Sequence, residues 1–222
     1  MISIGRILRG IYPRLLLLKK HFLYTCILLR SRWRRSSLTR IANKLGVELN
    51  LPPSVSINNA VIIGGQGVLD IGRNVVLGDD FSSFIPSPVS LVPFTLNAVI
   101  EIGEDTNVMN GTRIIAHKSI TVGSNCRLGP GVSILDFDTY SITPQTRSNA
   151  PGACAQIVLG ENVCVCEMAI ILKGVIIGRD SFIGPGAVVI DSIPAGAIAY
   201  GNPARVIGSV YDYEDNLAVE KD

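Results

Sequence analysis

Aliphatic residues recur every six positions over much of this chain. In the second half the recurring positions are Leu159, Val165, Ile171, Ile177, Ile183 and Val189. The same period appears earlier at Ile71 and Leu77, at Ile102, Val108 and Ile114, and at Val122, Leu128 and Ile134. A sustained period of six is typical of a β-solenoid, in which short stacked strands pool their buried side chains into one core. The pattern therefore predicts strands from about residue 55 to residue 200.

Three strands per coil would give a repeat of 18 residues, which is the distance from Leu159 to Ile177. Glycine follows many of the aliphatic positions, as tight corners require. A helical interpretation fits poorly, because apolar helix faces recur every three to four residues and this tract is rich in Val, Ile, Gly and Pro. With 222 residues and only 6% aromatic side chains, the chain fits one all-β solenoid domain with appendages.

Basic residues are concentrated at the start of the chain. Residues 1–50 carry eleven Lys or Arg and one acidic residue, Glu48, which leaves a net charge of −8 for the remainder. Two compatible interpretations stay open: residues 1–45 attach peripherally to the inner face of the cytoplasmic membrane, or they form a helical cap over the open end of the solenoid. Nucleic-acid binding is disfavoured, because the basic residues are mixed with long aliphatic side chains.

This basic segment does not fit a membrane span or a secretory signal. Its longest uncharged stretch, His21 to Leu29, has nine residues, against the roughly 20 that a spanning helix needs. Lys19 and Lys20 interrupt the apolar region that a signal peptide would need. The five cysteines lack a zinc-like spacing, so we expect reduced thiols, no bound metal and a cytoplasmic protein.

A polar insertion interrupts the repeat. Val122 and Leu159 are 37 residues apart, which exceeds one coil by nineteen, and the surplus lies at residues 136–156. Inserted loops on rigid scaffolds often carry function, so this loop is the leading candidate for a site, although a functionless excursion is the alternative. The predicted organisation is a basic segment at 1–50, a repeat domain at 51–207 with this loop, and a solvated acidic tail at 208–222.

Two stretches carry a family resemblance: IVLGENVCVCEMAIILKGVIIGRDSFIGPGAVV and SIPAGAIAYGNPARVI. They resemble the terminal coils and closing segment of the hexapeptide-repeat acyltransferases, in particular the maltose and galactoside O-acetyltransferase branch. The resemblance covers roughly residues 95 to 207 and implies a left-handed parallel β-helix, a handedness that the spacing itself does not reveal.

The resemblance also implies a function. It implies a homotrimer that binds acetyl-CoA between neighbouring β-helices and transfers the acetyl group directly to a hydroxyl. The acceptor would be a sugar or glycan of surface polysaccharide biosynthesis. The alternative is a catalytically degenerate trimer that acts as a scaffold or interaction protein.

The expected catalytic base of this family is a histidine on the inserted loop, and here Tyr140 stands in its place. A phenol is mostly protonated near neutral pH and is a poor base. Three explanations remain: His117 reaches the same cleft, Asp136 or Asp138 acts as a weak but ionised base, or the enzyme is inactive. His117 could also be an ordinary corner histidine.

The resemblance assigns roles to further residues. It implies that Asn110 positions the acceptor or the oxyanion, and that Arg147, like Asp136, contacts the substrate. Lys173 and Gly174 match positions near the pantetheine of acetyl-CoA. Arg205 matches a basic residue beside the CoA phosphates, which a guanidinium can bind with two hydrogen bonds. Asp191 departs from the family pattern and would repel phosphate.

Overall fold

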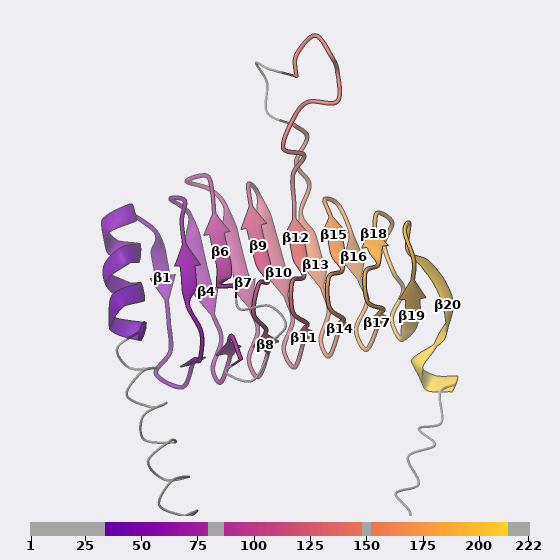
Figure 1. Cartoon of the computed structure of the whole chain (residues 1–222), viewed down its shortest axis with the longest axis horizontal. Coiled ribbons are helices and arrows are strands. Elements are labelled where there is room, and N and C mark those ends of the chain that lie inside the picture. Colours follow the sequence, from indigo (N-terminus) through magenta and orange to yellow (C-terminus); the bar gives the residue numbers. More distant parts are fainter. Residues whose placement is uncertain (1–33, 80–86, 148–151, 213–222) are drawn as a thin grey trace, which may run out of the picture.

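The chain folds into a solenoid of stacked three-stranded coils (Figure 1). The computed structural model describes residues 34–79, 87–147 and 152–212. Within these ranges the strands form three sheets, here called A, B and C, which are parallel up to the last strand, and from β1 to β18 the chain visits them in that order on every coil. This is a left-handed parallel β-helix, as predicted.

Each sheet collects one strand from every coil. Sheet A contains β1 (Glu48–Asn50), β4 (Val68–Ile71), β7 (Val99–Ile102), β10 (Ser119–Val122), β13 (Ile157–Leu159) and β16 (Ile176–Ile177). Sheet B contains β2 (Ser56–Ile57), β5 (Val76–Leu77), β8 (Asn107–Val108), β11 (Arg127–Leu128), β14 (Cys164–Val165), β17 (Phe182–Ile183), β19 (Ala197–Tyr200) and β20 (Arg205–Ser209). Sheet C contains β3 (Val61–Ile63), β6 (Val89–Pro93), β9 (Arg113–Ala116), β12 (Ser133–Leu135), β15 (Ile170–Leu172) and β18 (Val188–Val189).

The aliphatic repeat forms the core. All six positions from Leu159 to Val189 have at most 1% of their surface exposed. Leu159 pairs with Ile177 across neighbouring strands of sheet A, which confirms the 18-residue coil. Each of these aliphatic side chains therefore points inward and stacks on its counterpart in the next coil.

The inserted loop leaves the stack without disturbing it. Val122 pairs directly with Leu159, although 37 residues separate them. The surplus residues, 136–156, connect sheet C to sheet A, and we call them the arm. Its described residues, 136–147 and 152–156, project from the edge between these two sheets (Figure 1). The coil before the arm has 20 residues, from Ile102 to Val122, and its two extra residues lengthen β9 and β10 to four residues each.

A helix over residues 34–45 closes the first coil (Figure 1). Its buried residues Leu38 and Ala42 join the core, and the Arg35 guanidinium donates hydrogen bonds to backbone carbonyls of the first coil, among them that of Pro52 at 2.5 Å. The predicted helical cap is present over this stretch. The membrane hypothesis concerns residues 1–45, of which 1–33 lie outside the described residues. No helix in the described part of the chain is long and apolar enough to cross a membrane.

The C-terminal strand closes the other end. β20 pairs antiparallel with β19 and is followed by a short 3-10 helix, η1 (Val210–Asp212). The predicted start of the acidic tail at residue 208 therefore falls inside β20. Residues 213–222 of that tail lie outside the described residues.

Candidate active site

Most of the predicted site residues lie along one edge of the solenoid. The connections from sheet C to sheet A lie above one another along this edge, because the coils stack in register. They comprise residues 64–67, 94–98, 117–118, the arm at 136–156, 173–175 and 190–192. We call this the arm edge. His117, Asp138, Lys173 and Asp191 therefore occupy successive levels of the same edge.

Asp136 anchors the arm to the connection below it. Its two carboxylate oxygens accept the backbone N–H groups of His117 and Lys118, both at 2.7 Å, and its side chain is fully buried. A buried carboxylate that accepts two backbone N–H groups in this way stabilises the local backbone structure. Within the chain Asp136 positions the connection that carries His117, and its contact with substrate stays a prediction.

The imidazole of His117 lies between two phenylalanine rings. Its centroid is 3.7 Å from that of Phe137 above and 4.7 Å from that of Phe94 below, with interplanar angles of 13° and 9°. These distances are close to the spacing of neighbouring strands, so each ring comes from the next coil. Both imidazole faces are covered, and among the described residues neither ring nitrogen has a hydrogen-bond partner. The ring is thus held in orientation with its nitrogens available.

Phe94 and Phe137 were not identified from the sequence. A signal was present, because Phe94, His117 and Phe137 each come within two residues of the end of a strand of sheet C. An alignment of the corners of successive coils, in addition to the aliphatic positions, would have predicted that the three rings stack.

Asp138 and Lys173 form an ion pair at the root of the arm. The Lys173 ammonium lies 2.8 Å from Oδ1 of Asp138, and both side chains are less than a third exposed. The other oxygen, Oδ2, is buried and has no partner among the described residues. The backbone N–H of Gly174 also donates to the carbonyl of Ala155 in the arm, at 3.1 Å. In this structure the two predicted cofactor-binding residues, Lys173 and Gly174, therefore hold the arm.

Tyr140 and Arg147 lie farther out on the arm. Tyr140 is 67% exposed, and among the described aromatic contacts none joins it to His117. Arg147 donates to the backbone carbonyl of Ile142 at 3.1 Å and stabilises the turn of the arm. Both are on the same arm as Asp138, and among the described residues no hydrogen bond or ring contact joins either of them to the His117 stack.

Asn110 is located on a different edge. It lies in the connection between sheets B and C, is 2% exposed, and its side chain bonds to Asn59 and to the backbone N–H and carbonyl of Asp79. The structure therefore does not bring Asn110 next to His117 within one chain. Within the chain its amide links the connections at Asn59 and Asp79, and its contact with the acceptor or oxyanion stays a prediction.

The last connection of the arm edge carries an exposed ion pair. Nη1 of Arg205 lies 3.4 Å from the carboxylate of Asp191, and the same nitrogen donates to the carbonyl of Ala204 at 2.9 Å. The Arg205 side chain is exposed, and Asp191 neutralises part of its charge; binding of a phosphate by Arg205 stays a prediction.

The thiols are poor candidates for a nucleophile. Burial raises the pKa of Cys164, and burial together with the neighbouring Cys164 and Glu167 raises the pKa of Cys166 to about 12. Thiolates, which are the reactive form, are therefore scarce at neutral pH. Within the described ranges no group of three or more His, Cys, Asp or Glu side chains could hold a metal ion.

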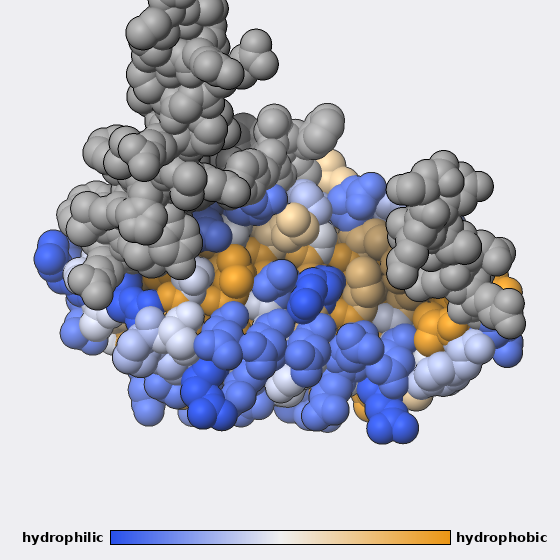
Figure 2. Space-filling view, turned by 90° about the horizontal axis from the view of Figure 1, so that it is seen from below, coloured by the Kyte–Doolittle hydropathy of each residue, from blue (hydrophilic) through white to orange (hydrophobic). Residues whose placement is uncertain are grey.

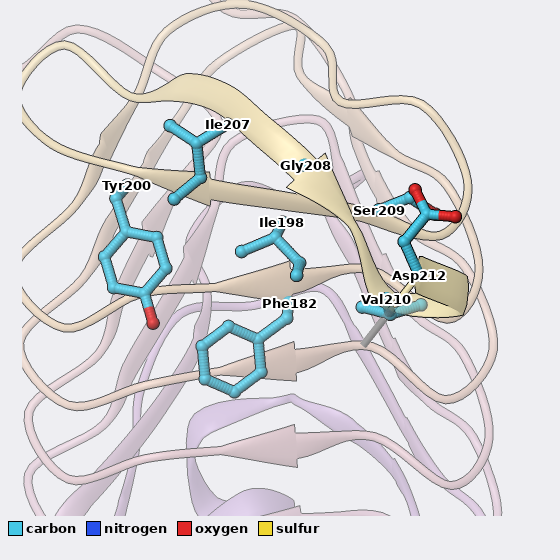
Figure 3. Close-up of a pocket in the computed structure, with 8 residues that line it drawn as sticks. All are labelled: Phe182, Ile198, Tyr200, Ile207, Gly208, Ser209, Val210 and Asp212. Carbon is cyan, nitrogen blue, oxygen red and sulfur yellow. The ribbon is translucent and has the colours of Figure 1, made fainter. Parts of the chain in front are cut away.

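A separate apolar pocket lies on the opposite side of the solenoid. Figure 2 shows the face turned away from the arm, where apolar side chains form a band beside a broad polar region. Near the C-terminal end of sheet B, Phe182, Ile198, Tyr200 and Ile207 line a pocket of about 720 Å³ (Figure 3). Asp212 is the one acidic residue among the lining residues and no histidine lines the pocket, so the arm edge, which carries His117, is the better site for acid–base chemistry.

Comparison with known proteins agrees with the fold. No model of a protein family matches the chain. A galactoside O-acetyltransferase of Escherichia coli (strain K12) is 31% identical over 121 residues, which cover 54% of this chain and 59% of the relative. One from Lactococcus lactis subsp. lactis (strain IL1403) is 33% identical over 114 residues, covering 48% and 55%. The chain thus matches somewhat more than half the length of these curated relatives.

Solved structures share the architecture. The polySia-specific acetyltransferase NeuO superposes with a TM-score of 0.59 at 23% identity, covering 74% of this chain and 68% of that one. AntD, an N-acyltransferase from Bacillus cereus, gives 0.59 at 21% identity, covering 77% and 87%. At such identities the structures support the fold alone. In its six-residue repeat, its β-helix and its similarity to the galactoside enzymes, this chain resembles the hexapeptide-repeat, left-handed β-helix acyltransferases.

Proposed function

We propose that this protein is a CoA-dependent O-acetyltransferase that moves the acetyl group of acetyl-CoA to a sugar hydroxyl. The observation that carries the proposal is the His117 imidazole, which is clamped between Phe94 and Phe137 with free nitrogens at the root of the arm. The galactoside O-acetyltransferase relatives support the enzyme over the scaffold alternative.

His117 would act as the general base. A ring nitrogen takes the proton of the acceptor hydroxyl while its oxygen attacks the thioester carbonyl; the new C–O bond forms, the C–S bond breaks, and the imidazolium returns the proton to the departing CoA sulfur. The two phenylalanines fix the orientation of the His117 ring, with its edge toward the reacting atoms. Less entropy is then lost on reaching the transition state, because the base is already oriented. Tyr140 has no described contact with this stack. With His117 as the base, the proposed reaction requires no catalytic role of Tyr140.

We propose the other sequence-based assignments for the assembled protein. The chain would form a homotrimer in which the arm edge faces a neighbouring β-helix, and the apolar band opposite the arm supports a buried contact surface (Figure 2). Arg205 would bind the CoA phosphates. The protein would act in the cytoplasm on glycans of surface polysaccharide assembly, with residues 1–45 holding it at the membrane.

Acetyl-CoA binding and turnover test the proposed function. Titration calorimetry with acetyl-CoA should show binding, and CoA release with glycan acceptors should fall by about 10²- to 10⁴-fold in His117→Ala. The matched control is Tyr140→Phe, which removes the phenolic hydroxyl on the same arm and should leave the rate within about twofold. Absence of acetyl-CoA binding, or equal rates in the parent and His117→Ala, would refute the proposal.

Light scattering tests the assembly separately. The expected mass is three chains of 23.8 kDa. Deletion of residues 1–33, which leaves the capping helix in place, should release the protein from anionic vesicles if the basic segment binds membrane. A monomer in solution would contradict the trimer.

A further inference from the structure

The ring stack on the arm edge ends at Phe94. One face of the Phe94 ring lies against His117, with centroids 4.7 Å apart, yet the side chain is 57% exposed. A ring at the end of such a stack must leave the face turned away from its neighbour available, unless another side chain covers it.

Glycines occupy the connection on the next level down. Residues 64–67 read Gly-Gly-Gln-Gly, and Gly65 has a φ of +88° that side-chain-bearing residues rarely adopt. A Cβ at Gly65 would lie 2.9 Å from the Cα of Phe94 and 1.9 Å from the carbonyl oxygen of Pro93. Gly65 cannot carry a side chain, and the register of β3 with β6 places Gln66 level with Phe94. The free face of Phe94 therefore borders the backbone step at Gly65 and Gln66.

Two amide side chains flank this step. Gln66 and Asn97 are both exposed and lie in the two connections that form it, and the backbone N–H of Gln66 donates to the carbonyl of Pro93 at 3.0 Å. Amide side chains both donate and accept hydrogen bonds, as groups that recognise hydroxyls must.

An exposed ring beside amide groups suits a pyranose. A sugar ring presents C–H groups with partial positive charge on its apolar face, and the face of an aromatic ring is electron-rich. We propose that Phe94, with Gln66 and Asn97, forms a subsite for a sugar unit of the acceptor, adjacent to the unit that is acetylated at His117.

This subsite specifies the class of acceptor. The free face of Phe94 lies on the far side of its ring from His117, so one sugar unit cannot stack there and also offer its hydroxyl to the imidazole. The acceptor is therefore a glycan of at least two units and not a free monosaccharide. This inference rests on the proposed acetyltransfer at His117.

Glycan binding without acetyl-CoA tests the subsite. The probes are an array of bacterial surface oligosaccharides and their component monosaccharides, applied to the parent and to F94A, F94L, F94W and L96A. The parent should bind at least one oligosaccharide, and binding should weaken about tenfold in F94A and F94L, which lack the ring face. F94W should retain binding. L96A, which truncates a neighbour that is 73% exposed, should match the parent.

Three results would overturn the subsite: no oligosaccharide bound by the parent, equal binding by F94A and the parent, or equal affinity for a glycan and its monosaccharide. Thermal unfolding of each variant shows whether it is folded, and F94L is the conservative replacement should F94A unfold. Acetyl-CoA binding by the same preparations separates the two proposals. If acetyl-CoA binds and F94A still binds glycan as the parent does, the subsite alone fails; if acetyl-CoA does not bind, the proposed function fails whatever the array shows.

Discussion

The carboxylate of Asp136 accepts the backbone N–H of His117 at 2.7 Å across 19 residues of sequence. The second carboxylate oxygen accepts the next backbone N–H, so the root of the arm and the connection that carries the imidazole form one unit. A change at Asp136 should therefore alter both the stability of the protein and the orientation of the proposed base.

Asp136→Asn should destabilise the fold and slow catalysis. An amide has one accepting oxygen, so one buried backbone N–H would face an NH₂ group and lose its partner, at a cost of about 1–3 kcal/mol. Chemical denaturation measures the free energy of unfolding, and CoA release measures the rate. The control is Glu161→Gln, the same change of charge at an exposed residue, which should alter stability by less than about 0.5 kcal/mol. Equal stability of Asp136→Asn and the parent would contradict the positioning role.

Lys173→Met should loosen the arm. The substitution keeps most of the side chain but removes the cation beside Asp138, which leaves a partly buried carboxylate with no charged partner and should cost about 1–2 kcal/mol. Limited proteolysis should cut the arm faster, and adding Asp138→Asn should recover part of the loss. If Lys173 instead serves acetyl-CoA alone, its loss would raise KM for acetyl-CoA and leave both proteolysis and stability unchanged.

The raised pKa of Cys166 predicts low reactivity and a defined pH dependence. Because its folded pKa is about 12, we expect slow alkylation by iodoacetamide at pH 8, well behind the exposed Cys154, with site-by-site mass spectrometry as the measurement. A raised pKa means that the folded state favours the protonated thiol of Cys166. The stabilisation that this thiol contributes is complete below its unfolded pKa of about 8.5 and is lost as pH rises toward its folded pKa. Stability should therefore fall less steeply between about pH 9 and 11 in Cys166→Ala. Alkylation of Cys166 as rapid as that of Cys154 would contradict the prediction.

Met168→Gly should stabilise the protein. Met168 has a φ of +59° in a connection between sheets B and C, where the corresponding residues of other coils are Gly111, Gly131 and Gly186. Left-handed backbone conformation costs a side-chain-bearing residue about 1–2 kcal/mol, and the entropy lost by glycine on folding offsets part of the gain, so we expect about 0.5–1 kcal/mol. Met109→Gly is the control, because Met109 lacks a positive φ and should be destabilised by the same change. Thermal unfolding distinguishes the two directions.

The repeat was predictable because it depends on local spacing. Each of Leu159, Ile171 and Ile183 is buried at the position that the six-residue period assigns, and the arm leaves the stack where the spacing lengthens. The ring stack around His117 and the pair of Asp138 with Lys173 were not predicted. These contacts join coils of different lengths, so the distance in sequence between partners varies while the distance in space does not.

The surroundings of Asn110 were not predictable from its place in the repeat. Its amide is engaged with the backbone of Asp79 on the edge between sheets B and C. Sequence alignment locates a residue in its coil, whereas its bonding depends on neighbours in the coils above and below it.

The direct pairing of Ile120 with Ile157 leaves the arm free to vary. Since β10 pairs with β13 in the same parallel fashion as β13 with β16, where no arm intervenes, the scaffold imposes no fixed length or composition on that segment. Descendants of this chain can thus exchange that segment while inheriting an unaltered interior.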